Sequence, residues 1–187
     1  MNALVTLIGT SVTRPSDAAR MLLGQGFARD TVWSLLALSV IASVLLTFAI
    51  SGGEAPEVVP GVSPFSPLMF AVFLGCSSII MGYGIYFTGN AMDGEGSLTN
   101  SILVVAWMQV LQVAALVVQG FLVLVSPGLG ALVAFAIGIG LIWVLLSFID
   151  VLHGFGSLGR SALLLLFVIV GIGLGLSLIL GLIGVGL

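Results

Sequence analysis

The sequence predicts an all-α integral membrane protein, a five-helix transmembrane bundle preceded by a short interfacial helix. Of its 187 residues, 60% are hydrophobic and only 6% are charged, whereas ordinary soluble domains contain roughly 25% charged residues. No residue between Glu95 and Asp150 is charged. A single helix of that length would far exceed the roughly 30 Å hydrocarbon core of a bilayer. This stretch must therefore cross the membrane at least twice.

Turn-forming residues divide the apolar sequence into five runs of about 20 residues, the length that a transmembrane helix needs. Prolines and glycines between residues 52 and 66 separate the first two runs, and Pro67 suits the first turn of the next helix. The sequence Ser-Pro-Gly-Leu-Gly at 126–130 is a tight turn. We therefore expect an amino-terminal segment, residues 1–30, and one membrane domain, residues 31–187. Its expected spans are 31–51, 67–87, 101–125, 129–149 and 162–184.

The basic residues predict the orientation of the chain. With five spans, the amino terminus and the second and fourth connections lie on the same side of the membrane. The chain has no lysine, and all of its arginines fall on that side: Arg14, Arg20, Arg29 and Arg160. The first connection carries only acidic charges. The positive-inside rule then places the amino terminus in the cytoplasm and the carboxyl terminus outside it.

The segment 14–26 is predicted to form the interfacial helix. Pro15 fits the first helical position, and Asp17 suits the positive end of the helix dipole. Ala18, Met21 and Leu22 form an apolar face at helical spacing beside Arg20. We expect this helix to lie in the cytoplasmic headgroup layer. There it would serve either as an anchor for the first span or as a docking surface for a soluble partner.

Stripes of small residues are predicted to mark the contacts between spans. Lipid supplies no hydrophobic drive between helices, so close backbone approach along such stripes holds a bundle together. The alternative is that these glycines let the helices slide. The stripes comprise Ala71, Gly75, Ser78 and Gly82 in the second span, Gly130, Ala134 and Gly138 in the fourth, and Gly173, Ser177 and Gly181 in the fifth.

The third span carries an intramembrane polar seam of three glutamines. At about 100° per residue, Gln109, Gln112 and Gln119 fall within a quarter of the helix circumference, and Trp107 points the opposite way. We expect the glutamines to face the bundle interior and form a modest interhelical network. The alternative is a hydrophilic path for a substrate. No ionisable residue lies near the middle of a span, which argues against an ion-coupled transporter.

A cytoplasmic polar cluster is predicted where the second and fourth connections share one face. It would gather Asp93, Glu95, Asp150, His153 and Arg160, so that charges at the membrane boundary are paired. The alternative is a catalytic or metal site. Zinc needs three or four His, Cys or carboxylate ligands, and one histidine supplies at most one acid–base group. Cys76 has no second thiol. We therefore expect a structural cluster, with no catalytic residue, metal or cofactor.

Three stretches give the chain a resemblance to a known family. They are residues 14–38, which lead into the first span, residues 89–112, which join the second span to the third, and residues 152–160, ahead of the last span. In these stretches and in its five-span plan, the chain resembles the Yip-domain family of Ypt/Rab-interacting membrane proteins, bacterial members in particular. Eukaryotic members are implicated in vesicle trafficking and contact prenylated small GTPases. We expect this chain to differ from them by lacking a long cytoplasmic amino-terminal region.

Two functions are therefore open. The first is a non-enzymatic scaffold or accessory protein in membrane organisation. The second is a small-molecule or lipid transporter, or a subunit of one, which only the glutamines favour. For either function we expect a multi-pass protein of the bacterial inner membrane with a periplasmic carboxyl terminus. Its expected partners are the lipid bilayer, other membrane proteins or a second copy, and no nucleic acid.

Overall fold

The computed structural model describes residues 2–53 and 65–182, and all regular secondary structure within these residues is helical. Among them, α3 to α7 are long and apolar enough to cross a membrane. These observations confirm the predicted fold class. The helices are α1 (Asn2–Thr13), α2 (Pro15–Leu23), α3 (Arg29–Ile50), α4 (Pro67–Ala91), α5 (Leu98–Val125), α6 (Pro127–His153) and α7 (Leu158–Leu182).

Prolines and serines begin several of these helices. A proline occupies the start of α2, α4 and α6, where its missing N–H removes no helical hydrogen bond. The Ser66 hydroxyl accepts a hydrogen bond from the Met69 N–H at 3.3 Å, and the Ser97 hydroxyl accepts one from the Asn100 N–H at 3.2 Å. These caps satisfy backbone donors that the first turn leaves free. The sequence thus fixes where α4 and α5 begin.

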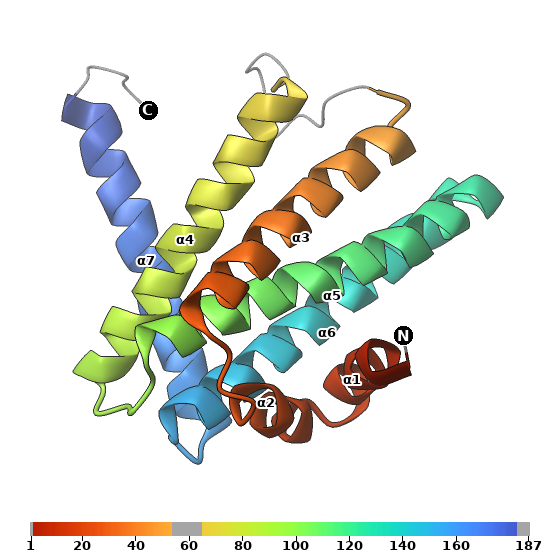
Figure 1. The fold of residues 1–187 in the computed structure, drawn as a ribbon. Coiled ribbons are helices and arrows are strands. Elements are labelled where there is room, and N and C mark those ends of the chain that lie inside the picture. The colour runs from red at the N-terminus through yellow and green to blue at the C-terminus, as the bar shows by residue number, and fades with distance from the viewer. Residues whose placement is uncertain (1, 54–64, 183–187) are drawn as a thin grey trace.

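The long helices converge at one end of the bundle and spread apart toward the other (Figure 1). We call the converging end the closed end. It carries the connections 92–97, between α4 and α5, and 154–157, between α6 and α7. Fully buried side chains gather near it, among them Ile85, Phe148 and Leu164. The second half of α7, by contrast, exposes its apolar side chains from residue 169 to 174. In a membrane, that half of the helix faces lipid or another chain.

Two short helices, α1 and α2, lie against α6 (Figure 1). Helix α2 falls within the predicted interfacial segment and buries Ala18 and Leu22. Helix α1 was not predicted. It is attached by a hydrogen bond that the Trp107 indole N–H donates to the Ser11 hydroxyl at 3.0 Å, and both side chains are buried. Trp107 therefore points away from Gln109, as its place on the helix indicates. On that side of α5 it bonds to α1.

The structure corrects the predicted stripes of small residues. A Cβ at Gly82 would meet the Ile102 side chain of α5, and one at Gly130 would lie 2.6 Å from Val123, so both glycines permit close packing. A Cβ at Gly75, Gly138 or Gly173 would meet open space. The predicted contact along α7 is therefore wrong at Gly173, because α7 has diverged from its neighbours at that level. Ser177 is exposed, and the surroundings of Gly181 lie outside the described residues.

Candidate functional site

The candidate site is the closed end, where the two connections meet. Helix α6 ends at His153, and Gly154 adopts the left-handed conformation with φ of 67°. The Gly154 and Phe155 N–H groups both donate to the Asp150 carbonyl. Such a glycine cap satisfies a carbonyl of the last turn and reverses the chain direction. The glycine after the histidine is therefore what sends the chain back toward α7.

The Asp150 side chain fixes the connection to α7. Its Oδ1 accepts a hydrogen bond from the Ser157 N–H at 2.7 Å, immediately before α7 begins. A carboxylate that accepts from a backbone N–H makes a charge-assisted bond, which is shorter and stronger than a neutral one. Asp150 thus orients the connection by bonding forward to Ser157.

His153 joins the two connections. Its side chain is only 2% exposed, its Nδ1 accepts from the Gly96 N–H at 3.2 Å, and its carbonyl accepts from the Glu95 N–H at 3.3 Å. The ring also stacks on Phe155, with centroids 5.3 Å apart. A neutral imidazole that accepts at Nδ1 carries its proton on Nε2. Nε2 is buried without a hydrogen-bond partner among the described residues.

Three glycines make room for the imidazole, and sequence reasoning did not single them out. A Cβ at Gly89, Gly94 or Gly96 would overlap the His153 ring; at Gly96 it would lie 2.6 Å from Cε1. We call these residues the glycine cradle. The signal was present in the sequence as three closely spaced glycines in 89–96. Spacing alone, however, does not say which side chain of a distant helix they receive.

Arg160 also crosses between the connections, but not to a carboxylate. Its Nη2 donates to the Met92 carbonyl at 2.7 Å, and its guanidinium lies 4.6 Å from the centroid of the Phe155 ring. The second contact is a cation–π interaction, which a planar guanidinium makes well. Phe155 therefore lies between the arginine and the histidine and contacts both.

The predicted pairing of charges at the closed end is wrong within the described residues. Asp93 and Glu95 are exposed, and the single ion pair there joins Arg20 to Asp17 at 3.4 Å, on α2. Asp93 adopts the left-handed backbone conformation in the connection 92–97, with φ of 62°, and the Glu95 N–H donates to the His153 carbonyl. Exposed carboxylates remain hydrated, so they gain little from an ion pair. The connections are joined instead by bonds from the His153 and Arg160 side chains to backbone groups, and by one bond between backbone groups.

The closed end encloses the one histidine of the chain, and this histidine belongs to no cluster of metal-ligating side chains among the described residues. Across the described residues, no three His, Cys, Asp or Glu side chains lie close enough together to hold a metal ion. The one histidine is enclosed by the glycine cradle and Phe155. A substrate would have to displace the connection 92–97 to reach it. The geometry is that of a structural joint between α4, α6 and α7.

The three glutamines behave differently from one another. Gln109 Nε2 donates to the Ser78 hydroxyl of α4 at 2.9 Å, and the Ser43 hydroxyl of α3 donates to Gln109 Oε1 at 3.4 Å. Gln109 therefore links three helices. Gln112 is exposed and lines a pocket of about 210 Å³ between α4, α5 and α6, and Gln119 is half-buried. Within the described residues, only the first of the three forms the predicted network.

Replacing Gln109 by leucine is expected to lower the free energy of unfolding by about 1 kcal/mol, since intramembrane hydrogen bonds average about 0.6 kcal/mol each. The matched control is Gln112→Leu, which removes a glutamine exposed at a similar depth and should leave stability unchanged or slightly raised. Thermal melting in one detergent measures both variants. Equal losses would show that the Ser43–Gln109–Ser78 contacts do not stabilise the bundle.

With this geometry established, the comparisons with known proteins identify the family. The family model of the Yip1 domain matches residues 9–179. The chain belongs to the Yip1-domain family. The match begins within α1 and ends within α7, so it covers α2 to α6 completely and most of α7 of this Yip1-domain protein. No curated protein and no solved structure matches the chain significantly.

Proposed function

We propose that this Yip1-domain protein is a non-enzymatic scaffold or accessory protein in membrane organisation. The observation that carries the proposal is the use of the polar groups at the closed end. His153, Asp150 and Arg160 all bond to backbone groups of the chain itself. Side chains engaged in this way hold the connections in place.

The opposite end of the bundle, where the long helices spread apart, supports the same proposal (Figure 1). We call it the open end. Apolar side chains on the second half of α7 are exposed from residue 169 to residue 174. A helix half that leaves its bundle offers surface to lipid or to another membrane protein. We therefore expect the protein to occur in assemblies with a second copy or with other membrane proteins. The exposed Gln112 is the observation that favours the alternative, a transporter.

The test compares assembly with transport. The tagged protein is extracted in polymer-bounded nanodiscs, and the mass of the particles is measured; we expect particles that hold more than one protein chain. In parallel, purified protein is reconstituted into liposomes that contain carboxyfluorescein and a fluorescent phospholipid. Dye release and lipid exchange between leaflets should match those of protein-free liposomes. Particles with a single chain would contradict the scaffold, and protein-dependent flux would support the transporter.

We also propose that the closed end faces the cytoplasm of a bacterial cell, because all four arginines lie in the segments on its side of the bundle. A topology reporter fused after Leu187 should then be active outside the cytoplasm, whereas one inserted between Asp93 and Ser97 should be active inside. The reverse pattern of reporter activity would contradict the proposal and place the closed end outside the cytoplasm.

A further inference from the structure

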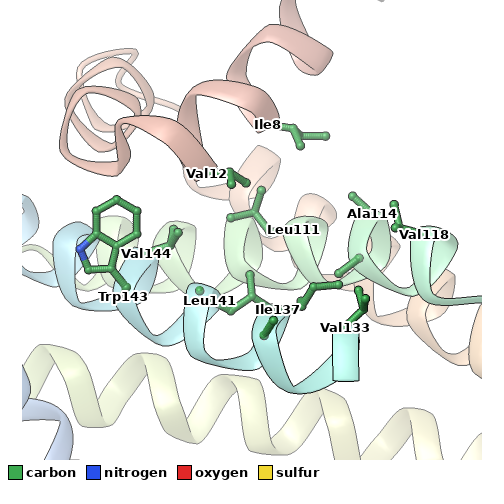
Figure 2. A pocket seen from close by; sticks show the side chains of 13 residues that line it. Ile8, Val12, Leu111, Ala114, Val118, Val133, Ile137, Leu141, Trp143 and Val144 are labelled. Atoms are coloured by element: carbon green, nitrogen blue, oxygen red, sulfur yellow. The ribbon is translucent and has the colours of Figure 1, made fainter. Parts of the chain in front are cut away.

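An apolar groove runs between α1 and the α5–α6 pair (Figure 2). Its volume is about 440 Å³. Ile8 and Val12 of α1 form one wall, Leu111 of α5 forms the floor, and Ile137 and Leu141 of α6 form the other wall. The Trp107–Ser11 hydrogen bond holds α1 in place beside the groove. The groove is therefore built into the fold.

A second, polar pocket of about 300 Å³ adjoins one end of the groove. Trp143 lines both spaces and stands at one end of the groove in Figure 2. Beside the apolar Pro15 and Leu158, this polar pocket is lined by polar and charged residues: Thr13, Arg14, Ser16, Asp17, Ser147 and Asp150. Tryptophan is enriched where membrane hydrocarbon meets the headgroup layer. The two pockets thus lie on either side of Trp143, the one residue that lines both, with the apolar groove on one side and the polar groups on the other.

Both walls change from apolar to polar in the same direction. Along α1 the lining residues pass from Ile8 and Val12 to Thr13, and Arg14 follows directly, before α2. Along α6 they pass from the range 133–144 to Ser147 and Asp150. The range 133–144 spans about 16 Å of helix. This is about half of a 30 Å hydrocarbon core, the depth of one leaflet. The order and the length match one lipid molecule standing in the leaflet at the closed end.

The charges of the polar pocket indicate which headgroup fits. Arg14 forms no ion pair or side-chain hydrogen bond within the described residues, whereas Asp17 is paired with Arg20. Asp150 uses Oδ1 for the Ser157 N–H. The pocket therefore presents one unpaired guanidinium and one carboxylate with its second oxygen available. A phosphate complements the first, and a primary ammonium complements the second.

We propose that this site binds a phospholipid with a primary-amine headgroup. One acyl chain occupies the groove between α1, α5 and α6, the phosphate contacts Arg14, and the ammonium group contacts Asp150. The polar pocket carries both signs of charge, Arg14 against Asp17 and Asp150, which suits a zwitterionic headgroup better than an anionic one. A bound lipid would also brace α1 against α6. The proposal does not depend on the scaffold function.

The test uses native mass spectrometry of the purified protein, titrated with phosphatidylethanolamine or with phosphatidylglycerol of the same acyl chains. Gly140 lines the groove and Gly138 does not, yet a Cβ at either position meets open space. Gly140→Leu therefore fills the groove, and Gly138→Leu is its matched control. Arg14→Gln removes the cation, and Asp150→Asn keeps an oxygen for the Ser157 N–H while removing the charge. Melting temperatures near that of the parent show that the variants are folded.

The parent protein and Gly138→Leu should retain one phosphatidylethanolamine per chain, in preference to phosphatidylglycerol. Gly140→Leu and Arg14→Gln should each weaken retention about tenfold or more, as expected for a blocked groove and for a lost charged hydrogen bond. Asp150→Asn should lose the preference between the two lipids. Equal retention of both lipids by the parent, equal retention by the two glycine variants, or a second chain in place of the lipid would each overturn the proposal.

Discussion

Replacing Gly89 by alanine is expected to lower the melting temperature of the protein sharply. The added methyl group would overlap the His153 imidazole, because its three nearest atoms are Cε1, Nε2 and Nδ1 of that ring. The ring cannot shift aside easily, because Phe155 stacks on it and the Gly96 N–H donates a hydrogen bond to its Nδ1. Overpacking of this kind costs about 1–3 kcal/mol and occasionally more.

A double-mutant cycle isolates the cause. His153→Ala alone should also destabilise the protein, because it empties the glycine cradle and leaves the Gly96 N–H without its acceptor. In the His153→Ala background, however, Gly89→Ala should lower the melting temperature little further, because the imidazole atoms that the new methyl group would overlap are absent. Gly75→Ala on the same helix is the control, because its Cβ meets open space. Equal melting temperatures for Gly89→Ala and Gly75→Ala would refute the cradle.

Leucine at Gly82 is the second change with a large expected effect. Its Cβ would meet the Ile102 side chain, and the Ile102 Cα lies only 3.5 Å away, so α5 would have to move as a whole. We expect a loss of about 3 kcal/mol or failure of α4 to pack on α5, because close backbone approach is what holds membrane helices together. Thermal melting and protease resistance in detergent measure the effect.

The same substitution at Gly173 provides the comparison. Leucine there meets open space and adds apolar surface on the diverging half of α7, so the melting temperature should stay near that of the parent. Both residues lie in stripes of small residues in the sequence. If Gly173→Leu destabilises the purified single chain as much as Gly82→Leu, then α7 packs on its neighbours along its whole length and the open end is misplaced.

The span count and the start of α4 at Pro67 could be predicted because they depend on local chemistry. The other long helices begin two to four residues before the expected spans. A run of about 20 apolar residues is long enough to cross a membrane. Because lipid offers no hydrogen-bond partner, each backbone group in the run must bond within its own helix. Proline at the start of α4 and serine before α5 then set where those helices begin. The opposite directions of Trp107 and Gln109 follow from helical periodicity in the same way.

The candidate site was predicted only in part. The shared position of the two connections follows from the five-span topology, and the structure does bring His153 and Arg160 to the connection 92–97. Their partners are backbone atoms of Gly96 and Met92. Every residue carries such atoms, so side-chain identity gives no sign of which will be used. Reasoning from charges alone favoured ion pairs with Asp93 and Glu95 that the structure does not contain.

The sequence by itself determined that this chain is a five-span α-helical membrane protein of the Yip1-domain type, because hydrophobicity and helix-starting residues act over a few turns. The tertiary structure decided which glycines lie in contacts, what His153 bonds to, and that α1 packs beside the groove. These features depend on the angles at which helices cross. Helices that converge at one end and diverge at the other turn Gly82 into a tight contact and leave Gly173 open, although the two residues look alike in the sequence.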